Sequence, residues 1–271
     1  MSKKDTILEK LNNLRNYILS LENVAVAFSG GVDSSFLLKV SHDVLGDKAI
    51  AITVDSELLP ESERNSAEKF CADYGIPFHR VKMDVLSIDE IRKNPRDRCY
   101  FCKRALFKRI FEVADSCGIA YIADGSNKDD ENDYRPGMKA LSELDVLSPL
   151  RECDLKKNEI RALSKQINMH TGDLPSAACL ASRVAYGEEL TAEKLLRVDK
   201  AEAFLKSLGF SQCRVRVHAG LARIETSDEH MQHAFLERQK ISDELKRLGF
   251  TYITIDLQGY RTGSFNEGVE L

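Results

Sequence analysis

A short apolar run that stops at a pair of glycines constrains this chain more than any other stretch. Residues 24–28 are Val-Ala-Val-Ala-Phe, Ser29 and the pair Gly30-Gly31 follow, and apolar side chains then recur at helical spacing over residues 36–40. This pattern predicts a strand, a tight loop and a helix in direct succession.

The residues of the loop favour a phosphate ligand. Gly30 and Gly31 lack Cβ atoms and can approach a ligand closely, and Ser34 and Ser35 add hydroxyl and N–H groups at the start of the helix. Neither the Walker A string nor the Gly-x-Gly-x-x-Gly string is present. Asp33 would repel a bare phosphate, so we expect a bridging divalent cation. The alternative is an ordinary Gly-Gly turn capped by serine, which the complete Ser-Gly-Gly-x-Asp-Ser string disfavours.

This string resembles the loop of the PP-loop ATP pyrophosphatases, which as a family cleave ATP between its α- and β-phosphates and adenylate a substrate oxygen. The resemblance implies ATP as the ligand and Mg²⁺ as the cation. It also implies a nucleotide site that contains Ser29, Gly30, Gly31, Asp33, Ser34 and Ser35.

Helix and strand patterns alternate on both sides of the loop. The expected elements are a helix at residues 4–21, strands at 49–54, 76–81 and 120–123, and a crossover helix at 61–74. This order predicts an α/β fold with a mostly parallel sheet, in which ligands bind beyond the carboxyl ends of the strands. Asp55 and Ser56 follow the second strand and are expected near the nucleotide, with helix capping by Ser56 or Ser62 an equally favoured alternative.

The loop after the fourth strand is polar. Gly125 can bring backbone close to a nucleotide, and its acidic neighbours Asp124, Asp129 and Asp130 could hold a cation. For Asp129 and Asp130 taken singly, a solvated acidic loop is the favoured interpretation.

Helical and strand patterns break between residues 162 and 188, where we expect a domain boundary. The prediction is a PP-loop domain at residues 1–172 and a smaller domain at 173–271 for substrate binding and oligomerisation. The second domain is expected to be an α-β-β-α-β unit, with a helix at 195–208 closed by Gly209, strands at 213–217 and 221–225, a helix at 229–248 and a strand at 252–257.

Two arginines share one face of the first strand of this unit. Arg214 and Arg216 are alternate residues, and with Arg261 they could clamp a phosphate or a carboxylate. Spacing alone favours the alternative, a solvated strand face that pairs with Glu225. His230 and His233 lie one helical turn apart without matching ligands and are interpreted as surface residues.

Charge and cysteine usage limit the partners and the compartment. The net charge of -4 argues against a nucleic-acid surface, and no stretch of the sequence is apolar enough to span a membrane. The first residues are charged rather than apolar, so a cytoplasmic location is expected. The seven cysteines should then be reduced, and some of them are candidates for metal binding.

Cys99 and Cys102 form a Cys-x-x-Cys pair flanked by basic residues, which should stabilise thiolates. Zinc sites, redox pairs and iron–sulfur proteins all contain such pairs. A structural zinc site would need two further ligands, and the sequence has no second Cys-x-x-Cys. A redox pair would not by itself explain an ATP-dependent loop.

Several further strings resemble the LarE family, the sulfur transferases of nickel-pincer nucleotide cofactor synthesis. They are residues 124–127, 133–137, 148–150 and 178–183, the Arg-x-Arg strand, and the late Gly-Tyr-Arg at 259–261. The resemblance implies sulfuration of pyridinium-3,5-biscarboxylic acid mononucleotide after its adenylation by ATP. It assigns the substrate phosphate to Arg214, Arg216 and Arg261, the nucleotide site to Gly125 and Arg183, and sulfur transfer to Cys179.

The family has two branches that differ in the source of sulfur. In one branch the cysteine that matches Cys179 gives up its own sulfur, and in the other three cysteines hold a [4Fe-4S] cluster with one iron open to hydrosulfide. This chain has Cys99, Cys102 and Cys179, so the resemblance implies the cluster branch. The implied partners are sulfide or a sulfur-delivering protein and further copies of the chain, with no nucleic acid or membrane. A tRNA thiolase and a non-enzymatic ATP or iron–sulfur sensor remain as alternatives.

Overall fold

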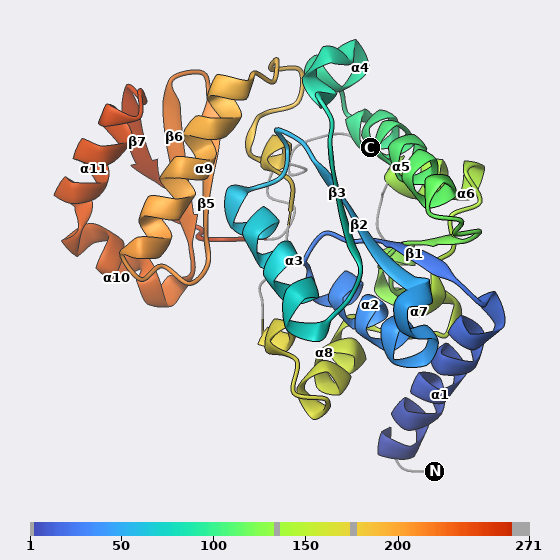
Figure 1. The fold of residues 1–271 in the computed structure, drawn as a ribbon. Helices are drawn as coiled ribbons and strands as arrows, with labels where there is room; N and C mark the ends of the chain where they lie inside the picture. The colour runs from blue at the N-terminus through green and yellow to red at the C-terminus, as the bar shows by residue number, and fades with distance from the viewer. Residues whose placement is uncertain (1–2, 133–135, 174–177, 262–271) are drawn as a thin grey trace. The chain divides into compact units, whose positions relative to one another are not determined.

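The computed structural model describes residues 3–132, 136–173 and 178–261 (Figure 1). Contacts divide the chain into two compact units. Unit 1 comprises the described parts of residues 1–56, 61–84 and 97–177, and unit 2 those of residues 57–60, 85–96 and 178–271. Within the described ranges, none of the helices combines the length and the apolar character that a membrane span requires.

Unit 1 is built on a parallel sheet of four strands in the order β3-β2-β1-β4. The strands are β1 (Val24–Ala27), β2 (Ala49–Asp55), β3 (Phe78–Lys82) and β4 (Ile122–Ala123). The strand that ends at the glycine pair, β1, therefore lies inside the sheet, between β2 and β4. The predicted α/β class and parallel sheet are confirmed.

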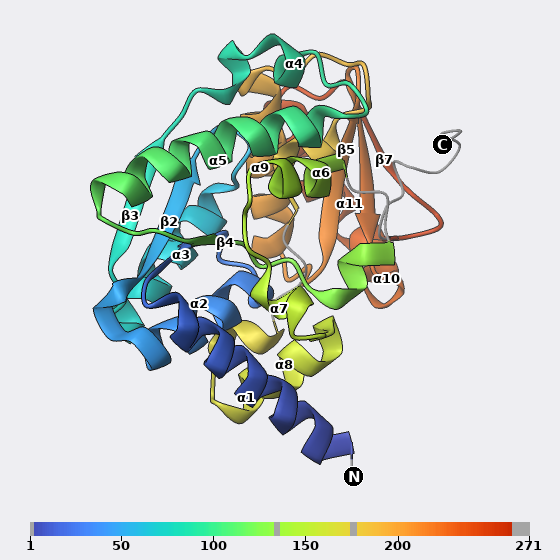
Figure 2. The ribbon, with the colours of Figure 1, turned by 90° about the vertical axis from the view of Figure 1, so that its right-hand side faces the viewer.

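Helices cover this sheet. They are α1 (Lys3–Leu21), α2 (Val32–Leu45), α3 (Glu61–Tyr74), α5 (Arg98–Ser116), α6 (Pro136–Glu143), α7 (Pro149–Glu152) and α8 (Lys157–Gln166). Short 3-10 turns lie at Gly46–Lys48, Lys128–Asn132 and His170–Asp173. In Figure 2, α5 crosses in front of β2 and β3.

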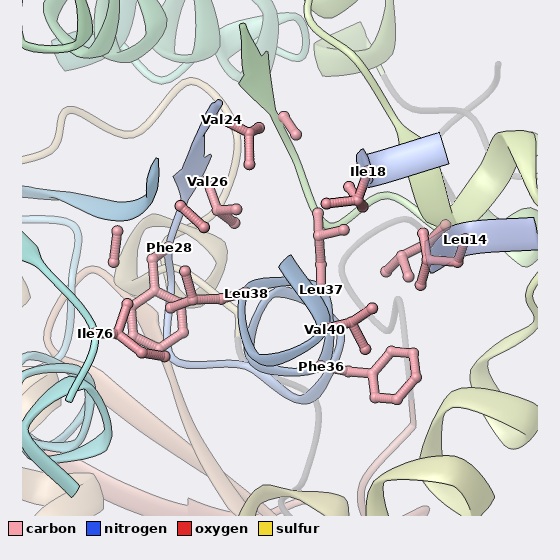
Figure 3. Packing of buried hydrophobic residues seen from close by; sticks show 14 of the residues in the cluster. Leu14, Ile18, Val24, Val26, Phe28, Phe36, Leu37, Leu38, Val40 and Ile76 are labelled. Carbon is pink, nitrogen blue, oxygen red and sulfur yellow. The ribbon is translucent and has the colours of Figure 1, made fainter. Parts of the chain in front are cut away.

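Two apolar cores lie on opposite faces of the sheet. Val24 and Val26 pack with side chains of α1, α2, α3 and α8, whereas Ala25 packs with α5 and α6. Figure 3 shows Leu37 directed toward the α1 residue Ile18 and Leu38 directed toward Phe28, which belong to the first core. Because both faces are covered, the strand is apolar at every position instead of alternating.

Unit 2 contains a mixed sheet in the order β5-β6-β7, antiparallel between β5 and β6 and parallel between β6 and β7. Val215 and Ile224, both fully buried, face each other on one side of this sheet. The elements are 3-10 turns at Val85–Ser87 and Leu180–Arg183, α4 (Asp89–Arg92), α9 (Ala192–Ser207), β5 (Cys213–His218), β6 (Leu221–Thr226), α10 (Asp228–Leu236), α11 (Arg238–Arg247) and β7 (Tyr252–Ile255).

Several predicted bounds are corrected by the structure. The single helix predicted at 229–248 is divided at Glu237 into α10 and α11. The last strand ends at Ile255, because a turn follows in which the Gln258 N–H donates to the Asp256 carboxylate at 2.9 Å. Gly209 closes α9 with φ of 96°, as predicted. The long helix α5, which carries both residues of the Cys-x-x-Cys pair, was not predicted.

Candidate functional site

The loop between β1 and α2 has a shape that its own side chains maintain. The Ser34 hydroxyl lies 3.1 Å from the Ser29 hydroxyl and donates to the Gly31 carbonyl at 3.2 Å. Gly30 has φ of 75°, a conformation that residues with a Cβ atom rarely adopt. Ser35 is fully buried, so its hydroxyl does not reach the surface of the loop. Ser29, the two glycines and Asp33 are at least partly accessible, whereas Ser34 and Ser35 are buried.

The loop after β4 lies directly against the start of α2. A Cβ atom on Gly125 would come within 2.8 Å of the Ser34 nitrogen and 3.0 Å of the Ser34 Cα. Backbone atoms at that distance cannot move aside cheaply, so glycine is required here for the contact between two segments of backbone. The structure therefore brings together two strings that lie about 90 residues apart in the sequence.

Asp124 is the centre of a saturated hydrogen-bond network. One carboxylate oxygen accepts from the Ser126 hydroxyl at 2.5 Å and from the Lys103 ammonium at 3.3 Å. The other oxygen accepts from the Ser148 hydroxyl at 2.8 Å and from the Ser126 N–H at 3.2 Å. The network joins β4, α5 and the start of α7, and it fixes the loop that presses Gly125 against α2.

Asp33 differs from Asp124 in having one oxygen without a partner. Its Oδ2 atom forms an ion pair with the Lys157 ammonium, whereas its Oδ1 atom is buried and has no hydrogen-bond partner among the described residues. Burial raises the pKa of the Asp33 carboxyl, and Lys157 opposes that rise. Lys157 lies 124 residues away in the sequence, and sequence reasoning missed it.

The acidic residues after Gly125 stabilise their own loop. The Asp129 carboxylate accepts from the Lys157 N–H at 2.9 Å, and the Asp130 carboxylate accepts from the Asn127 N–H at 2.9 Å. Asp130 is buried rather than solvated, and its charge contributes to the raised pKa of Asp33. These two residues therefore close the loop and place the first residue of α8.

Asp55 and Ser56 lie at the carboxyl end of β2, and both are buried. The Asp55 carboxylate is bound by two arginines, Arg80 at 2.7 Å and Arg64 at 3.4 Å. Both of its oxygens are thus engaged within unit 1, and a role at the nucleotide stays a prediction.

In unit 2, Cys179 is exposed on a backbone that Arg183 holds in place. The Arg183 guanidinium donates to the Ala178 carbonyl at 2.5 Å and to the Cys179 carbonyl at 3.0 Å. Its other nitrogens make a bidentate pair with Glu202 at 2.9 Å, and both side chains are at most 5% exposed. Burial would raise the pKa of the Glu202 carboxyl, but Arg183 and Arg214 outweigh it, so this pKa is lowered. The nucleotide-binding role of Arg183 stays a prediction.

The arginine face of the small sheet is buried. Arg214 and Arg216 are 7% and 6% exposed, and Arg216 makes a 2.9 Å ion pair with Glu225, which is fully buried. The predicted pairing with Glu225 is therefore present, but it is not the solvated face that spacing favoured. Arg261 lies 3.8 Å from Asp256 and donates to the Gly259 carbonyl at 3.2 Å.

The seven cysteines are all free, and they differ in burial. Burial raises the pKa of Cys71 and of Cys213 to about 12 and that of Cys153 to about 11, which makes these thiols poor ligands and nucleophiles. Cys99 and Cys102 are partly exposed and lie one turn apart on α5, so they can act as a pair of ligands. Cys179 belongs to the other unit. Within the described residues of either unit, no three His, Cys, Asp or Glu side chains converge as a metal site.

Comparison with known proteins agrees with the loop geometry. A model of the PP-loop domain matches residues 3–134. The chain is 41% identical over 261 residues to an uncharacterised protein of Synechocystis sp., covering 95% of this chain and 97% of that protein. It is 37% identical over 263 residues to pyridinium-3,5-bisthiocarboxylic acid mononucleotide synthase of Lactiplantibacillus plantarum, covering 97% and 95%.

A more distant relative covers only part of the chain. A glutamine-hydrolysing GMP synthase of Archaeoglobus fulgidus has a subunit that is 29% identical over 155 residues, which is 53% of this chain and 50% of that protein. The two longer similarities extend across both units and include both the loop before α2 and the loop that contains Gly125. The chain belongs to the LarE family of PP-loop ATP pyrophosphatases.

Proposed function

We propose that the protein adenylates the carboxylates of pyridinium-3,5-biscarboxylic acid mononucleotide with ATP and then replaces carboxylate oxygen with sulfur. The similarity to the Lactiplantibacillus plantarum synthase over nearly the whole of both chains supports this substrate. The observation that carries the proposal is the nucleotide loop itself, in which Gly30 and Gly31 stand at the end of β1 with Asp33 in the first turn of α2.

The chain's own residues suit an Mg²⁺-bound triphosphate. The amides of Gly30 and Gly31 cradle a phosphate, and the buried open Oδ1 atom of Asp33 is a hard oxygen ligand of the kind that Mg²⁺ prefers. Lys157 already places a cation on the same carboxylate. When bound, Mg²⁺ neutralises charge on the departing pyrophosphate.

The proposed reaction has two steps. A substrate carboxylate oxygen attacks the α-phosphorus of ATP and pyrophosphate leaves, which yields an acyl-adenylate. A sulfur nucleophile then attacks the acyl carbon and AMP leaves with the original oxygen, which yields a thiocarboxylate. Arg214, Arg216 and Arg261 bind the substrate phosphate, for which the guanidinium fork is suited. Arg183 holds the backbone that presents Cys179.

The sulfur source is proposed to depend on Cys99, Cys102 and Cys179. Three thiolates would hold a [4Fe-4S] cluster, which when bound would supply sulfide at its open iron. The partly exposed pair on α5 supports this donor set, and the exposure of Cys179 suits a ligand as well as a sacrificial donor. The second candidate is therefore transfer of the Cys179 sulfur itself. Sulfide or a sulfur-delivering protein would be a partner in the first case, and a homo-oligomer remains the expected assembly.

Product analysis tests the reaction. Incubation with Mg²⁺-ATP, sulfide and the pyridinium substrate should release AMP and pyrophosphate by ³¹P NMR, and Asp33→Asn should abolish that release. ADP and phosphate as the main products would refute the assignment.

Iron content and intact mass test the sulfur source. Cys99→Ala, Cys102→Ala and Cys179→Ala, each purified anaerobically, should lose most of the bound iron, whereas Cys117→Ala, which removes an exposed thiol, should not. The wild-type chain should turn over repeatedly with sulfide at unchanged mass. Loss of H2S from Cys179, with one product per chain and no dependence on iron, would identify the cysteine as the donor.

A further inference from the structure

Lys157 stands where the proposed function requires Mg²⁺. Its ammonium is paired with Asp33 Oδ2, while Asp33 Oδ1 is buried and has no hydrogen-bond partner among the described residues. The backbone of Lys157 is held without help from Asp33, because its N–H donates to Asp129 at 2.9 Å. Next to it, the Lys156 N–H donates to Glu159 at 2.9 Å, and Glu159 in turn accepts from Lys10 at 3.1 Å.

The Asp33–Lys157 pair differs from the structural carboxylates of the same unit. Asp124 has hydrogen-bond donors on both oxygens, and Asp55 has one arginine on each oxygen. Within the described part of the chain, Asp33 has a single ion-pair partner, whose side chain is 29% exposed, and the Asn127 side chain is a second, neutral hydrogen-bonding neighbour of the carboxylate. A lysine side chain is a flexible stem with a point charge at its end, so Lys157 can leave Asp33 while the start of α8 stays in place.

The charges of Lys157, the metal ion and the nucleotide determine which ligand must be present when Lys157 leaves Asp33. A divalent cation that approaches Asp33 alone meets the ammonium at ion-pair distance and is repelled by it. A triphosphate supplies the negative charge that the ammonium needs once it leaves the carboxylate. We propose that Lys157 is a placeholder for Mg²⁺: it neutralises Asp33 in the nucleotide-free protein, and it moves to a phosphate when ATP arrives and Mg²⁺ takes the carboxylate.

The inference rests on the ATP and Mg²⁺ site of the proposed function and adds the order in which the two ligands bind. Metal binds Asp33 together with nucleotide and not before it. Lys157 is then a phosphate-binding residue of the triphosphate complex, and the two ligands are positively linked, because each removes the obstacle to the other.

Manganese binding without nucleotide tests the placeholder directly. Mn²⁺, followed by EPR, replaces Mg²⁺, and Lys157→Met is compared with Lys156→Met, which removes the same charge from the adjacent exposed lysine. Lys157→Met should bind one Mn²⁺ about tenfold more tightly than the wild type, because the repulsion is gone. Lys156→Met should match the wild type. Adding Asp33→Asn to Lys157→Met should remove the new site.

The wild type provides a second measurement that does not depend on any variant folding. The α,β-methylene analogue of ATP should raise the Mn²⁺ affinity of the wild type by roughly a hundredfold. It should raise the Mn²⁺ affinity of Lys157→Met or Lys157→Gln much less. Equal Mn²⁺ affinity of the wild type with and without the analogue would overturn the proposal. So would unchanged affinity in nucleotide-free Lys157→Met. Neither measurement contains the pyridinium substrate, so release of AMP and pyrophosphate by the same preparation would leave the proposed function standing.

Discussion

The two polar regions of this protein satisfy their charges in different ways. Around the nucleotide loop, hydroxyl, amide and ammonium donors occupy both oxygens of Asp124, whereas Asp33 has one lysine on one oxygen and its other, buried oxygen is open. On the arginine face of unit 2, the strong contacts are between opposite charges, and Glu202 and Glu225 are buried with their arginines.

This difference predicts how much stability a substitution costs in each region. Asp124 has several donors, so removing one of them should cost about 1.5–3 kcal/mol, the range for a hydrogen bond to a charged group, and the loop should keep its outline. A buried ion pair that loses one partner leaves an uncompensated charge and costs about 3–5 kcal/mol. Substitutions in unit 2 are therefore expected to act on folding first, and those in the loop of unit 1 on ligand binding first.

The largest expected effect is on the Arg183–Glu202 pair. Glu202→Gln should lower the free energy of unfolding by about 3–5 kcal/mol, because the guanidinium of Arg183 stays buried without its counter-charge. Glu193→Gln on the same helix is the matched control: its side chain is 83% exposed, and breaking its pair with Arg197 should cost about 0.5 kcal/mol or less. Urea unfolding measures both, and equal effects would mean that the buried pair stabilises unit 2 no more than an exposed pair does.

The same pair predicts a pH dependence with a definite sign. The pKa of Glu202 is lowered in the folded protein from 4.5, so the pair stabilises the fold above about pH 4.5 and loses that contribution as the pH falls through the folded-state value. The wild type should lose stability over this window more steeply than Glu202→Gln. Parallel curves for the two proteins would contradict the assignment.

A smaller effect is expected where the two loops of unit 1 meet. Gly125→Ala places a Cβ atom 2.8 Å from the Ser34 nitrogen, so it should cost about 1–3 kcal/mol of stability and also weaken ATP binding, since the start of α2 must shift. Gly118→Ala has open space and a positive φ, so it should cost about 1–2 kcal/mol from backbone strain and leave ATP affinity unchanged. Calorimetric titration separates the two outcomes.

The smallest expected effect concerns the cysteines and involves no change in fold. Iodoacetamide at neutral pH should alkylate the exposed Cys179 and Cys117 in the metal-free protein and spare Cys71, Cys153 and Cys213, whose pKa values are raised by burial. Peptide mass spectrometry reports the order of modification. Early alkylation of Cys213 would mean that unit 2 opens more readily than its buried ion pairs imply.

The sequence pattern was sufficient to predict the elements that depend on local contacts. Helical periodicity located α1, α2 and α9, and the glycine pair located the nucleotide loop. It did not predict α5, although Phe107, Ile110 and Ala114 recur there at helical spacing. It merged α10 with α11, which the structure divides at Glu237.

The interaction partners in each site are far apart in the sequence, so local sequence patterns cannot predict them. Lys157 meets Asp33 across 124 residues, and Arg183 meets Glu202 only once the Leu180–Arg183 turn has packed on α9. Spacing favoured a solvated arginine face paired with Glu225; Arg216 does pair with Glu225, but both side chains are buried. Gly125 was expected to approach a nucleotide, and the structure shows its closest constraint to be the backbone of Ser34.

Crossed titrations test the central claim, that unit 1 binds the nucleotide and the arginine face of unit 2 binds the substrate phosphate. Asp33→Asn and Arg214→Gln are each titrated with the α,β-methylene analogue of ATP, with and without Mg²⁺, and with the pyridinium mononucleotide. Arg214 is chosen because Arg216 remains to neutralise the buried Glu225.

Asp33→Asn should lose the gain in analogue affinity that Mg²⁺ gives the wild type and should bind the pyridinium mononucleotide normally. Arg214→Gln should bind the analogue normally and lose about 2–5 kcal/mol of affinity for the mononucleotide. If either folded variant lost affinity for both ligands, or if Arg214→Gln lost the nucleotide instead, the division of the two sites between the two units would be contradicted.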